Sequence, residues 1–233
     1  MNVPGFSEEL YRGFDWRFDE VRKLQNLING ERDSTERSEL RKSLVVLLYA
    51  HFEGFCVFAL EHYLATVNRC RLSCRDAVAS IVAGSWEPIF NAMEHGDEKC
   101  RVFLRPLPDD RRLHRHWRRR HFVDEIETFW NLPVELDEKV IDAESNLKPE
   151  VLQRNLFVLG LDHRFVEPFA AKLQNLLGRR NRIAHGDDRR PVDEREYSEY
   201  ETAVFEICVR LVDFLGESVA ARAYKRAAPG FAI

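Results

Sequence analysis

The sequence predicts an all-α protein, and three observations support this fold class. Apolar residues recur at three- and four-residue steps over long stretches, which is the period of a helix with one buried face. No stretch shows the strict alternation of apolar and polar residues that is typical of a half-buried strand. Gly30, Pro149, Gly160 and Gly186 stand at expected helix boundaries. The 233 residues therefore indicate one helical domain, residues 1–233, with four to five long helices.

The first helix is expected from Ser7 to about Gly30. Ser7 can cap the N-terminus, and Glu8 and Glu9 suit the positive end of the helix dipole. The apolar positions of this helix are Leu10, Phe14, Phe18, Val21, Leu24 and Ile28. The polar stretch from Ser34 to Ser38 is expected to be a connector.

The second helix, from Leu40 to about Asn68, carries apolar residues on more than one face, so we expect it to be central. Gly54 lies inside it at a cost of about 1 kcal/mol relative to alanine, which indicates a close approach by another helix. His51 is interpreted as a satisfied core or interface histidine. Glu53 lies among aromatic residues and needs either a surface position or a partner.

Residues 70–133 show no clear period and are interpreted as a partly irregular insertion between two helical halves. The whole chain has a net charge of −4, but from Arg101 to His121 there are eight arginines against two aspartates. A function in nucleic-acid binding can therefore be argued only from such local charge.

Helical periodicity returns after residue 140. Ser145 or Asn146 can cap a helix that has Pro149 in its first turn and ends at Gly160. A longer helix is expected from about Arg164 to His185, with Gly186 as its stop. Asp193 is expected to cap a last helix over residues 194–225, followed by a loose tail at about 226–233.

The stretch "LGRRNRIAHGDD", residues 177–188, ends the longer helix with a cluster of polar groups. Asn181 and His185 are one helical turn apart on the same face, and Arg180 lies on an adjacent face. Arginine binds phosphate oxygens, and histidine can transfer a proton near neutral pH. Such groups can cleave RNA without a metal if a base activates the ribose 2′-hydroxyl and an acid protonates the leaving oxygen.

One copy of this stretch supplies a single histidine, so the chemistry predicts a symmetric dimer with a two-fold axis at this helix end. From the spacing alone, an ordinary helix end is the commoner interpretation, because arginine and histidine complement the dipole in a last turn. Asp187 and Asp188 either raise the pKa of His185 or form a turn, and turn formation is the commoner role.

Further residues are predicted to bind RNA: Arg179 and Arg182 beside the helix end, and Arg115, Trp117, Arg118, Arg119 and Arg120 in the basic stretch "RRLHRHWRRRH", residues 111–121. The basic stretch can equally be a solvated face, or a partner for the acidic residues that follow it. His114, His116 and His121 form no complete ligand set, and the five cysteines lack zinc spacing. We therefore expect no metal, no cofactor and no disulfide.

The motif "RRNRIAHG" at the end of an apolar helix resembles the signature of the HEPN superfamily, with Arg180, Asn181 and His185 as the matching residues. The flanking segments "SLVVLLYAHFEGF", "DAESNLKPEVLQRNLFVLGLD" and "VDEREYSEYETAV" resemble a bacterial branch of the MAE or RiboL-PSP type. The resemblance covers roughly residues 7–68 and 140–220, but not the insertion.

The resemblance implies a HEPN-type helical bundle that acts as a metal-independent endoribonuclease and as a homodimer with both motifs at the interface. Arg180 and His185 would be catalytic, Asn181 would orient them, and Glu53 would support the site. Many relatives are toxins of toxin–antitoxin pairs or phage-defence effectors, so an antitoxin protein is a further expected partner. The alternative is a non-catalytic HEPN module that binds RNA or protein. A metal-dependent hydrolase has little support in the sequence.

We expect the protein to be cytoplasmic and to have no contact with a membrane. The longest apolar run, Leu44 to Ala50, is much shorter than the ~20 residues that a bilayer requires. The N-terminal residues include acids and lack the apolar core of a signal peptide.

Overall fold

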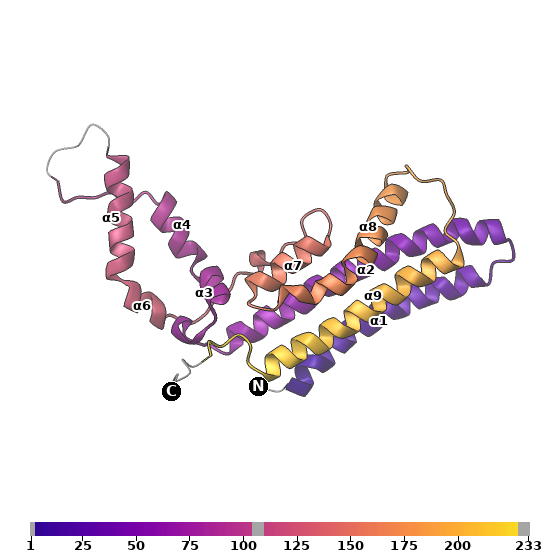
Figure 1. The fold of residues 1–233 in the computed structure, drawn as a ribbon, viewed down its shortest axis with the longest axis horizontal. Coiled ribbons are helices and arrows are strands. Elements are labelled where there is room, and N and C mark those ends of the chain that lie inside the picture. The colour runs from indigo at the N-terminus through magenta and orange to yellow at the C-terminus, as the bar shows by residue number, and fades with distance from the viewer. Residues whose placement is uncertain (1–2, 104–109, 228–233) are drawn as a thin grey trace.

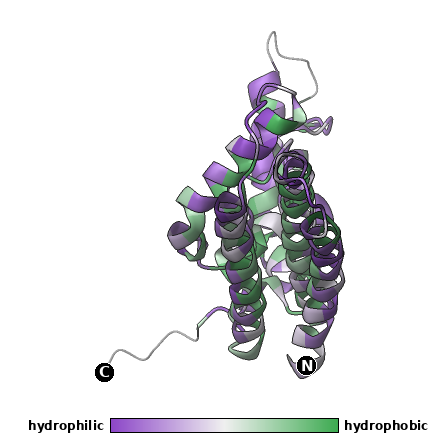
Figure 2. Cartoon of the chain, turned by 90° about the vertical axis from the view of Figure 1, so that its right-hand side faces the viewer, coloured by the Kyte–Doolittle hydropathy of each residue, from purple (hydrophilic) through white to green (hydrophobic). Residues whose placement is uncertain are grey.

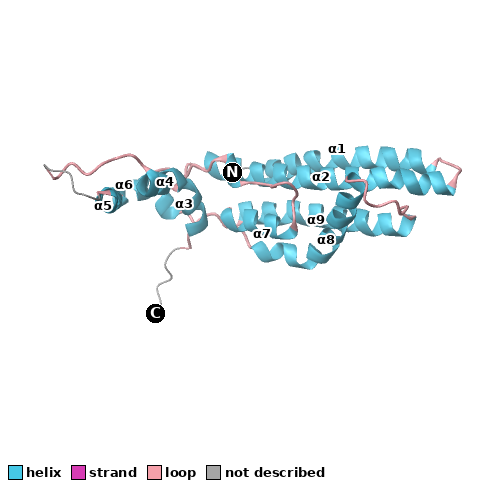
Figure 3. Cartoon of the chain, turned by 90° about the horizontal axis from the view of Figure 1, so that it is seen from above, coloured by secondary structure: helices cyan, strands magenta, loops and turns pink. Residues whose placement is uncertain are grey.

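The computed structural model describes residues 3–103 and 110–227 (Figure 1). All regular structure in these residues is helical, apart from two isolated bridges that pair Ser73 with Pro133 and Ala77 with Lys225 (Figure 3). The prediction of an all-α fold is confirmed.

Four helices form the main bundle: α1 (Val3–Asn29), α2 (Ser34–Arg69), α8 (Ala170–Ala184) and α9 (Glu194–Ala220). Helices α1, α2 and α9 run alongside one another, and α2 packs against α1, α8 and α9 (Figure 1). The view along the bundle shows hydrophobic positions mostly between the helices and hydrophilic ones mostly outside (Figure 2). The central position expected for the second helix is therefore confirmed.

Burial in the bundle accounts for the apolar character of α2. By length and composition this helix could cross a membrane, but half of its most apolar segment is buried inside the protein. Tyr49, Phe52 and Phe55 are at most 1% exposed. Such a helix is typical of the core of a bundle.

The ends of the first two helices differ from the prediction. The Asp33 carboxylate accepts the backbone N–H groups of Thr35 at 2.7 Å and Glu36 at 3.2 Å. Because Asp33 caps α2 in this way, residues 34–38 form its first turns, and the predicted connector there was wrong. Helix α1 begins at Val3, before Ser7.

The close approach expected at Gly54 is made by a side chain of α1. The Arg17 guanidinium donates to the Gly54 carbonyl at 3.3 Å, and a Cβ on Gly54 would lie 3.8 Å from Arg17 Nε. His51 also faces α1, with its Nε2 2.9 Å from the Glu20 carboxylate. His51 and Glu53 therefore point in different directions from α2.

Residues 79–103 and 110–131 form an arm that projects from one end of the bundle (Figure 1). It contains α3 (Ala79–Ser85), α4 (Glu87–His95), α5 (Arg111–Asp124) and α6 (Ile126–Asn131), after a 3-10 turn at Cys74–Asp76. The predicted insertion is therefore more helical than its sequence indicated. Its small core is a cluster of rings with centroids 4.6 to 6.3 Å apart, namely Trp86, Phe90, Phe122, Phe129 and Trp130.

A second layer connects the arm to α8. It comprises a 3-10 turn at Glu138–Val140, α7 (Pro149–Val158) and a 3-10 helix at His163–Phe169. Gly160 has a φ of 72°, as expected for a residue that ends a helix. Lys148, rather than Ser145 or Asn146, precedes α7, and no side chain caps that helix.

The last two helices are shorter than predicted. The α-helical part of the segment after Arg164 begins only at Ala170, because Pro168 has no N–H to donate. Asp193 caps α9 through the N–H of Glu196 at 2.8 Å, as predicted. Helix α9 ends at Ala220, five residues before the predicted end at residue 225. Of the expected tail, residues 228–233 lie outside the described part of the chain.

Candidate active site at the end of α8

Helix α8 ends within the predicted motif. The backbone N–H of His185 donates to the Asn181 carbonyl at 3.0 Å, and Gly186 follows with a φ of 75°. The N–H of Asp187 then donates to the Arg182 carbonyl at 2.9 Å and closes the helix end. Glycine adopts this backbone conformation without strain, which is why the helix stops here. His185 is consequently an exposed residue at the very end of α8.

Arg180 is half-buried and held by three different elements. Its Nη1 donates to the side-chain oxygen of Asn146 at 2.6 Å and to that of Asn181 at 2.8 Å. Its guanidinium carbon lies 4.8 Å from the centre of the Tyr49 ring, at the distance of a cation–π contact. The position of the Arg180 guanidinium is thus fixed from three places: the segment before α7, the last turn of α8 and the core helix α2.

Glu53 contributes to this arrangement without touching Arg180. One oxygen of its carboxylate accepts the Tyr49 hydroxyl at 2.9 Å and the backbone N–H of Leu147 at 3.0 Å. It therefore positions both the ring beneath Arg180 and the segment that carries Asn146. Burial, followed by the charge of Glu53, raises the pKa of Tyr49, which keeps its hydroxyl protonated as a donor.

Sequence reasoning missed two residues of this network. Tyr49 lies one turn before Glu53 on α2, so helical spacing could have predicted that the two side chains lie close together. Asn146 was interpreted as a helix cap, and its actual partner is 34 residues away along the chain. No local pattern reveals such a contact.

The structure brings Arg180 and Asn181 together but leaves the imidazole of His185 outside their network. Within the described residues, its side chain forms no hydrogen bond or ion pair. One chain therefore offers a positioned cation and, at the same helix end, a solvent-exposed group that can accept or donate a proton.

Arg179 lies next to Arg180 in the sequence, but its contacts give it a structural role. Its side chain is 0% exposed and forms ion pairs with Asp188 and, at 3.0 Å, with Glu196. It also donates to the carbonyls of Arg190 at 2.9 Å and Pro191 at 3.0 Å. Arg179 ties the segment between α8 and α9 to both helices, so we remove it from the predicted RNA-binding residues.

Asp188 serves as a turn and ion-pair residue. It accepts from Arg179, from the backbone N–H of Arg190 at 2.9 Å and from Arg182 at 3.3 Å. The hydrogen bond from Arg179, followed by the one from the backbone, lowers the pKa of Asp188 to about 2. Arg182 itself is exposed and accessible to a ligand.

The basic residues of α5 also divide into two groups. Arg118 donates to the carbonyls of Met93 and Glu98, each at 3.0 Å, and of Glu94 at 3.4 Å, so it clamps α5 to α4 and the segment after it. The remaining predicted residues lie at the surface: Arg115, Arg119 and Arg120 are exposed and Trp117 is half-buried.

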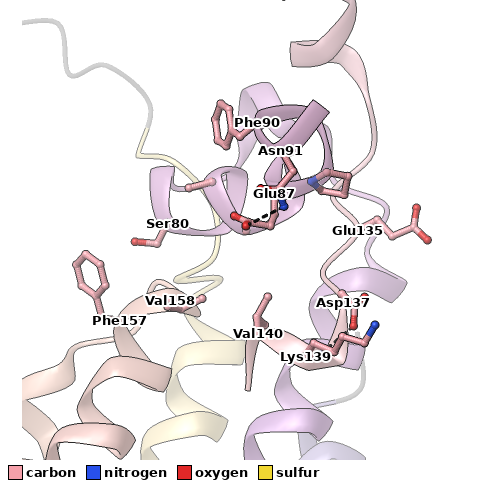
Figure 4. Close-up of a pocket in the computed structure, with 13 residues that line it drawn as sticks. Ser80, Glu87, Phe90, Asn91, Glu135, Asp137, Lys139, Val140, Phe157 and Val158 are labelled. Carbon is pink, nitrogen blue, oxygen red and sulfur yellow. Dashed lines mark hydrogen bonds between the residues drawn. The ribbon is translucent and has the colours of Figure 1, made fainter. Parts of the chain in front are cut away.

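Helix α5 and the end of α8 form separate sites. Figure 1 places α5 in the arm and the end of α8 on the bundle, with α7 between them. A pocket of about 760 Å³ lies where the arm meets α7, between Phe90 and Asn91 on one side and Phe157 and Val158 on the other (Figure 4). Its lining contains no residue of the α8 motif.

No group of three histidine, cysteine, aspartate or glutamate side chains among the described residues is arranged to hold a metal ion. The five cysteines are free thiols.

A family model described as RiboL-PSP-HEPN matches residues 13–217. The match includes most of the bundle, the α8 motif and the arm. The chain belongs to the RiboL-PSP-HEPN family. Membership of this HEPN family indicates a ribonuclease-like or RNA-binding role. No match was found among curated proteins or among solved structures.

Proposed function

We propose that this RiboL-PSP-HEPN protein is a metal-independent endoribonuclease whose active site forms where two α8 ends meet in a homodimer. The observation that carries the proposal is the fixed position of Arg180, held by Asn146, Asn181 and the Tyr49 ring, on the helix whose end presents the exposed His185. This arrangement suits a pentavalent phosphorus intermediate, whose extra negative charge a prepositioned guanidinium can stabilise.

The proposed reaction is attack by the ribose 2′-oxygen on the adjacent phosphorus. His185 of one protomer accepts the 2′-hydroxyl proton, and the new P–O2′ bond forms as the P–O5′ bond breaks. The second His185 donates a proton to the leaving 5′-oxygen. The products are a 2′,3′-cyclic phosphate and a 5′-hydroxyl, and no metal is required.

Dimerisation follows from the need for both a base and an acid. Each chain presents one exposed histidine at the motif, and a symmetric pair about a two-fold axis supplies the second. The test is RNA cleavage by the purified protein in EDTA, with the new ends identified by mass spectrometry. Unchanged cleavage by the His185→Ala variant would overturn the catalytic assignment.

A mixing experiment tests the composite site itself. When wild-type protein exchanges subunits with an equal amount of His185→Ala, about half of the wild-type chains enter mixed dimers that contain one histidine. If both histidines are needed, activity falls to about half of the wild-type value. Retention of full activity would show that each chain acts alone. Arg22→Ala, a change on the exposed face of α1, is the control partner.

In the cell, we propose that the enzyme acts in the cytoplasm as a toxin of a toxin–antitoxin pair or as a phage-defence effector. Expression of the wild-type chain should then arrest growth, and His185→Ala should relieve the arrest.

A non-catalytic module is the second candidate. This alternative is favoured by the contacts of Arg180, whose Nη1 already donates to the side-chain amides of Asn146 and Asn181 within one chain. A guanidinium engaged in this way can hold a phosphate without promoting its reaction. RNA binding without turnover, and growth unaffected by wild-type expression, would support this alternative.

A further inference from the structure

The charge of the molecule is unevenly distributed, and the arm carries a positive segment. From Glu94 to Asp124 there are nine lysines and arginines against six aspartates and glutamates, although the whole chain has a net charge of −4. A cationic region on an acidic protein attracts polyanions locally while the rest of the surface repels them.

Several of these cations are already neutralised or committed to the fold. Arg119 pairs with Glu94 at 2.6 Å, and Arg120 pairs with Asp124 at 3.4 Å. Arg118 donates hydrogen bonds to three backbone carbonyl groups. The contacts of Arg118 and Arg119 hold α5 on α4, and all three arginines are less available to a ligand.

Two other cations line a pocket and have no such partner. A pocket of about 390 Å³ lies between the end of α4, the segment after it and α5, and both Lys99 and Arg115 contribute to its wall. Neither side chain forms a hydrogen bond or ion pair within the described residues, and both residues are exposed. The charge of Arg115 contributes only a minor part of the lowered pKa of Glu94.

The rest of the lining leaves the pocket cationic. It contains Arg111, His114 and Arg118 as well as two acids, Glu94 and Asp97. Glu94 is paired with Arg119, so Asp97 is the main anionic competitor. His114 Nε2 lies 2.8 Å from the Asp110 carboxylate and its Nδ1 accepts the Cys100 N–H at 3.1 Å, which braces the pocket wall.

We infer that this pocket is a second RNA-binding site that holds a backbone phosphate between Lys99 and Arg115, remote from the site of cleavage. The inference extends the proposed ribonuclease function. In the view of Figure 1, α5 in the arm and α8 on the bundle both extend upward relative to the long helices, so we expect a sufficiently long RNA strand to contact both. The pocket then strengthens the binding of long RNA and does not affect the chemistry of cleavage.

The expected behaviour depends on RNA length. An RNA dinucleotide occupies only the α8 site, whereas an RNA of about 30 nucleotides can reach the arm as well. Lys99→Glu/Arg115→Glu should weaken binding of the long RNA by about tenfold at moderate salt. It should also reduce the slope of log affinity against log salt by about 0.7, the value for one phosphate contact to a single strand.

The experiment measures binding by fluorescence anisotropy in the His185→Ala background and cleavage in the otherwise wild-type chain. Arg12→Glu/Lys23→Glu is the matched control, since it makes the same charge change at exposed positions of α1. The dinucleotide should be cleaved at an unchanged kcat/KM by the arm variant, while the KM for long RNA rises. Lys99→Gln/Arg115→Gln should give a smaller change in the same direction.

The outcomes separate this inference from the proposed function. Binding of long RNA that is unchanged, or weakened equally by the control variant, would overturn the inference even if RNA is cleaved. A length-dependent loss of binding in a protein that cleaves no RNA would support the arm site and overturn the ribonuclease proposal. Because the contact is to phosphate, single-stranded DNA of the same length should show the same loss.

Discussion

The end of α8 and helix α5 are both rich in arginine, yet their arginines have different environments. At the end of α8, Arg179 is fully buried among two carboxylates and two carbonyls, while its neighbour Arg180 is half-buried on an aromatic ring. On α5, Arg118 is bound to three carbonyls, while Arg115 lines an open pocket. Each region therefore contains one arginine that holds the fold and another that remains available to a ligand.

The partners of an arginine, rather than its place in a basic run, therefore decide its role in this protein. Proton transfer and RNA affinity are also assigned to different places, because His185 lies at the end of α8 and the unpaired cations Lys99 and Arg115 line the pocket of the arm.

Arg179→Ala should destabilise the fold most. Removing one partner of a buried ion pair typically costs about 3–5 kcal/mol, and this change leaves both Asp188 and Glu196 without their buried cation. Chemical denaturation should show the loss as a lower midpoint. Arg195→Ala, which removes an exposed pair with Glu199 on α9, should change stability little. Equal stability of the two variants would contradict the structural role of Arg179.

Arg180→Ala should instead leave the fold intact and reduce cleavage by about 10²–10³-fold, the usual effect of removing one group that stabilises transition-state charge. Circular dichroism and RNA cleavage rates provide the two measurements. Arg22→Ala, which removes an exposed pair with Asp19 on α1, is the control. Cleavage by Arg180→Ala at the wild-type rate would remove this arginine from the mechanism.

Tyr49→Phe should reduce cleavage by up to about tenfold. The change keeps the ring beneath Arg180 but removes the hydroxyl that donates to Glu53, a bond worth up to about 1.5 kcal/mol. Tyr11→Phe removes an equivalent hydroxyl bond to Asp213 away from the motif and should have no effect on cleavage. If the two variants behave alike, Tyr49 does not act as a positioning residue for Arg180.

Arg118→Ala should loosen the arm by about 1 kcal/mol, since it removes hydrogen bonds from α5 to the end of α4 and the segment after it. Faster amide hydrogen exchange in α4 and α5, with unchanged exchange in α8, is the expected observation. Arg112→Ala on the same helix removes no hydrogen bond or ion pair among the described residues. Exchange that rises to the same degree in both variants would count against the clamp.

The ion pair of Asp188 should make a small contribution to acid sensitivity. Its pKa is about 2 in the folded protein and about 3.8 when unfolded, so the stabilisation is complete above pH 4. It is lost as the pH falls from about 4 to about 2, because the unfolded chain then binds more protons. Asp188→Asn should flatten the stability curve in that range, and an unaltered acid slope would rule out this contribution.

The helical fold and the motif were predictable because both depend on local patterns. Periodic apolar residues identified the long helices, and Gly186 and Asp193 marked real boundaries. The arm was not predictable in detail, since its helices are short and its core consists of rings from distant parts of the segment. The contacts of Arg179 and Asn146 also escaped prediction, because burial and long-range partners leave no local signal.

The most direct test of the account compares cleavage of one RNA dinucleotide in EDTA by the wild type, Arg180→Ala, His185→Ala and Lys99→Glu/Arg115→Glu. We expect cyclic-phosphate products from the wild type and the arm variant at equal rates, and a loss of at least about 10²-fold for the two α8 variants. Cleavage by all four at similar rates, or a loss in the arm variant as large as that in His185→Ala, would contradict it.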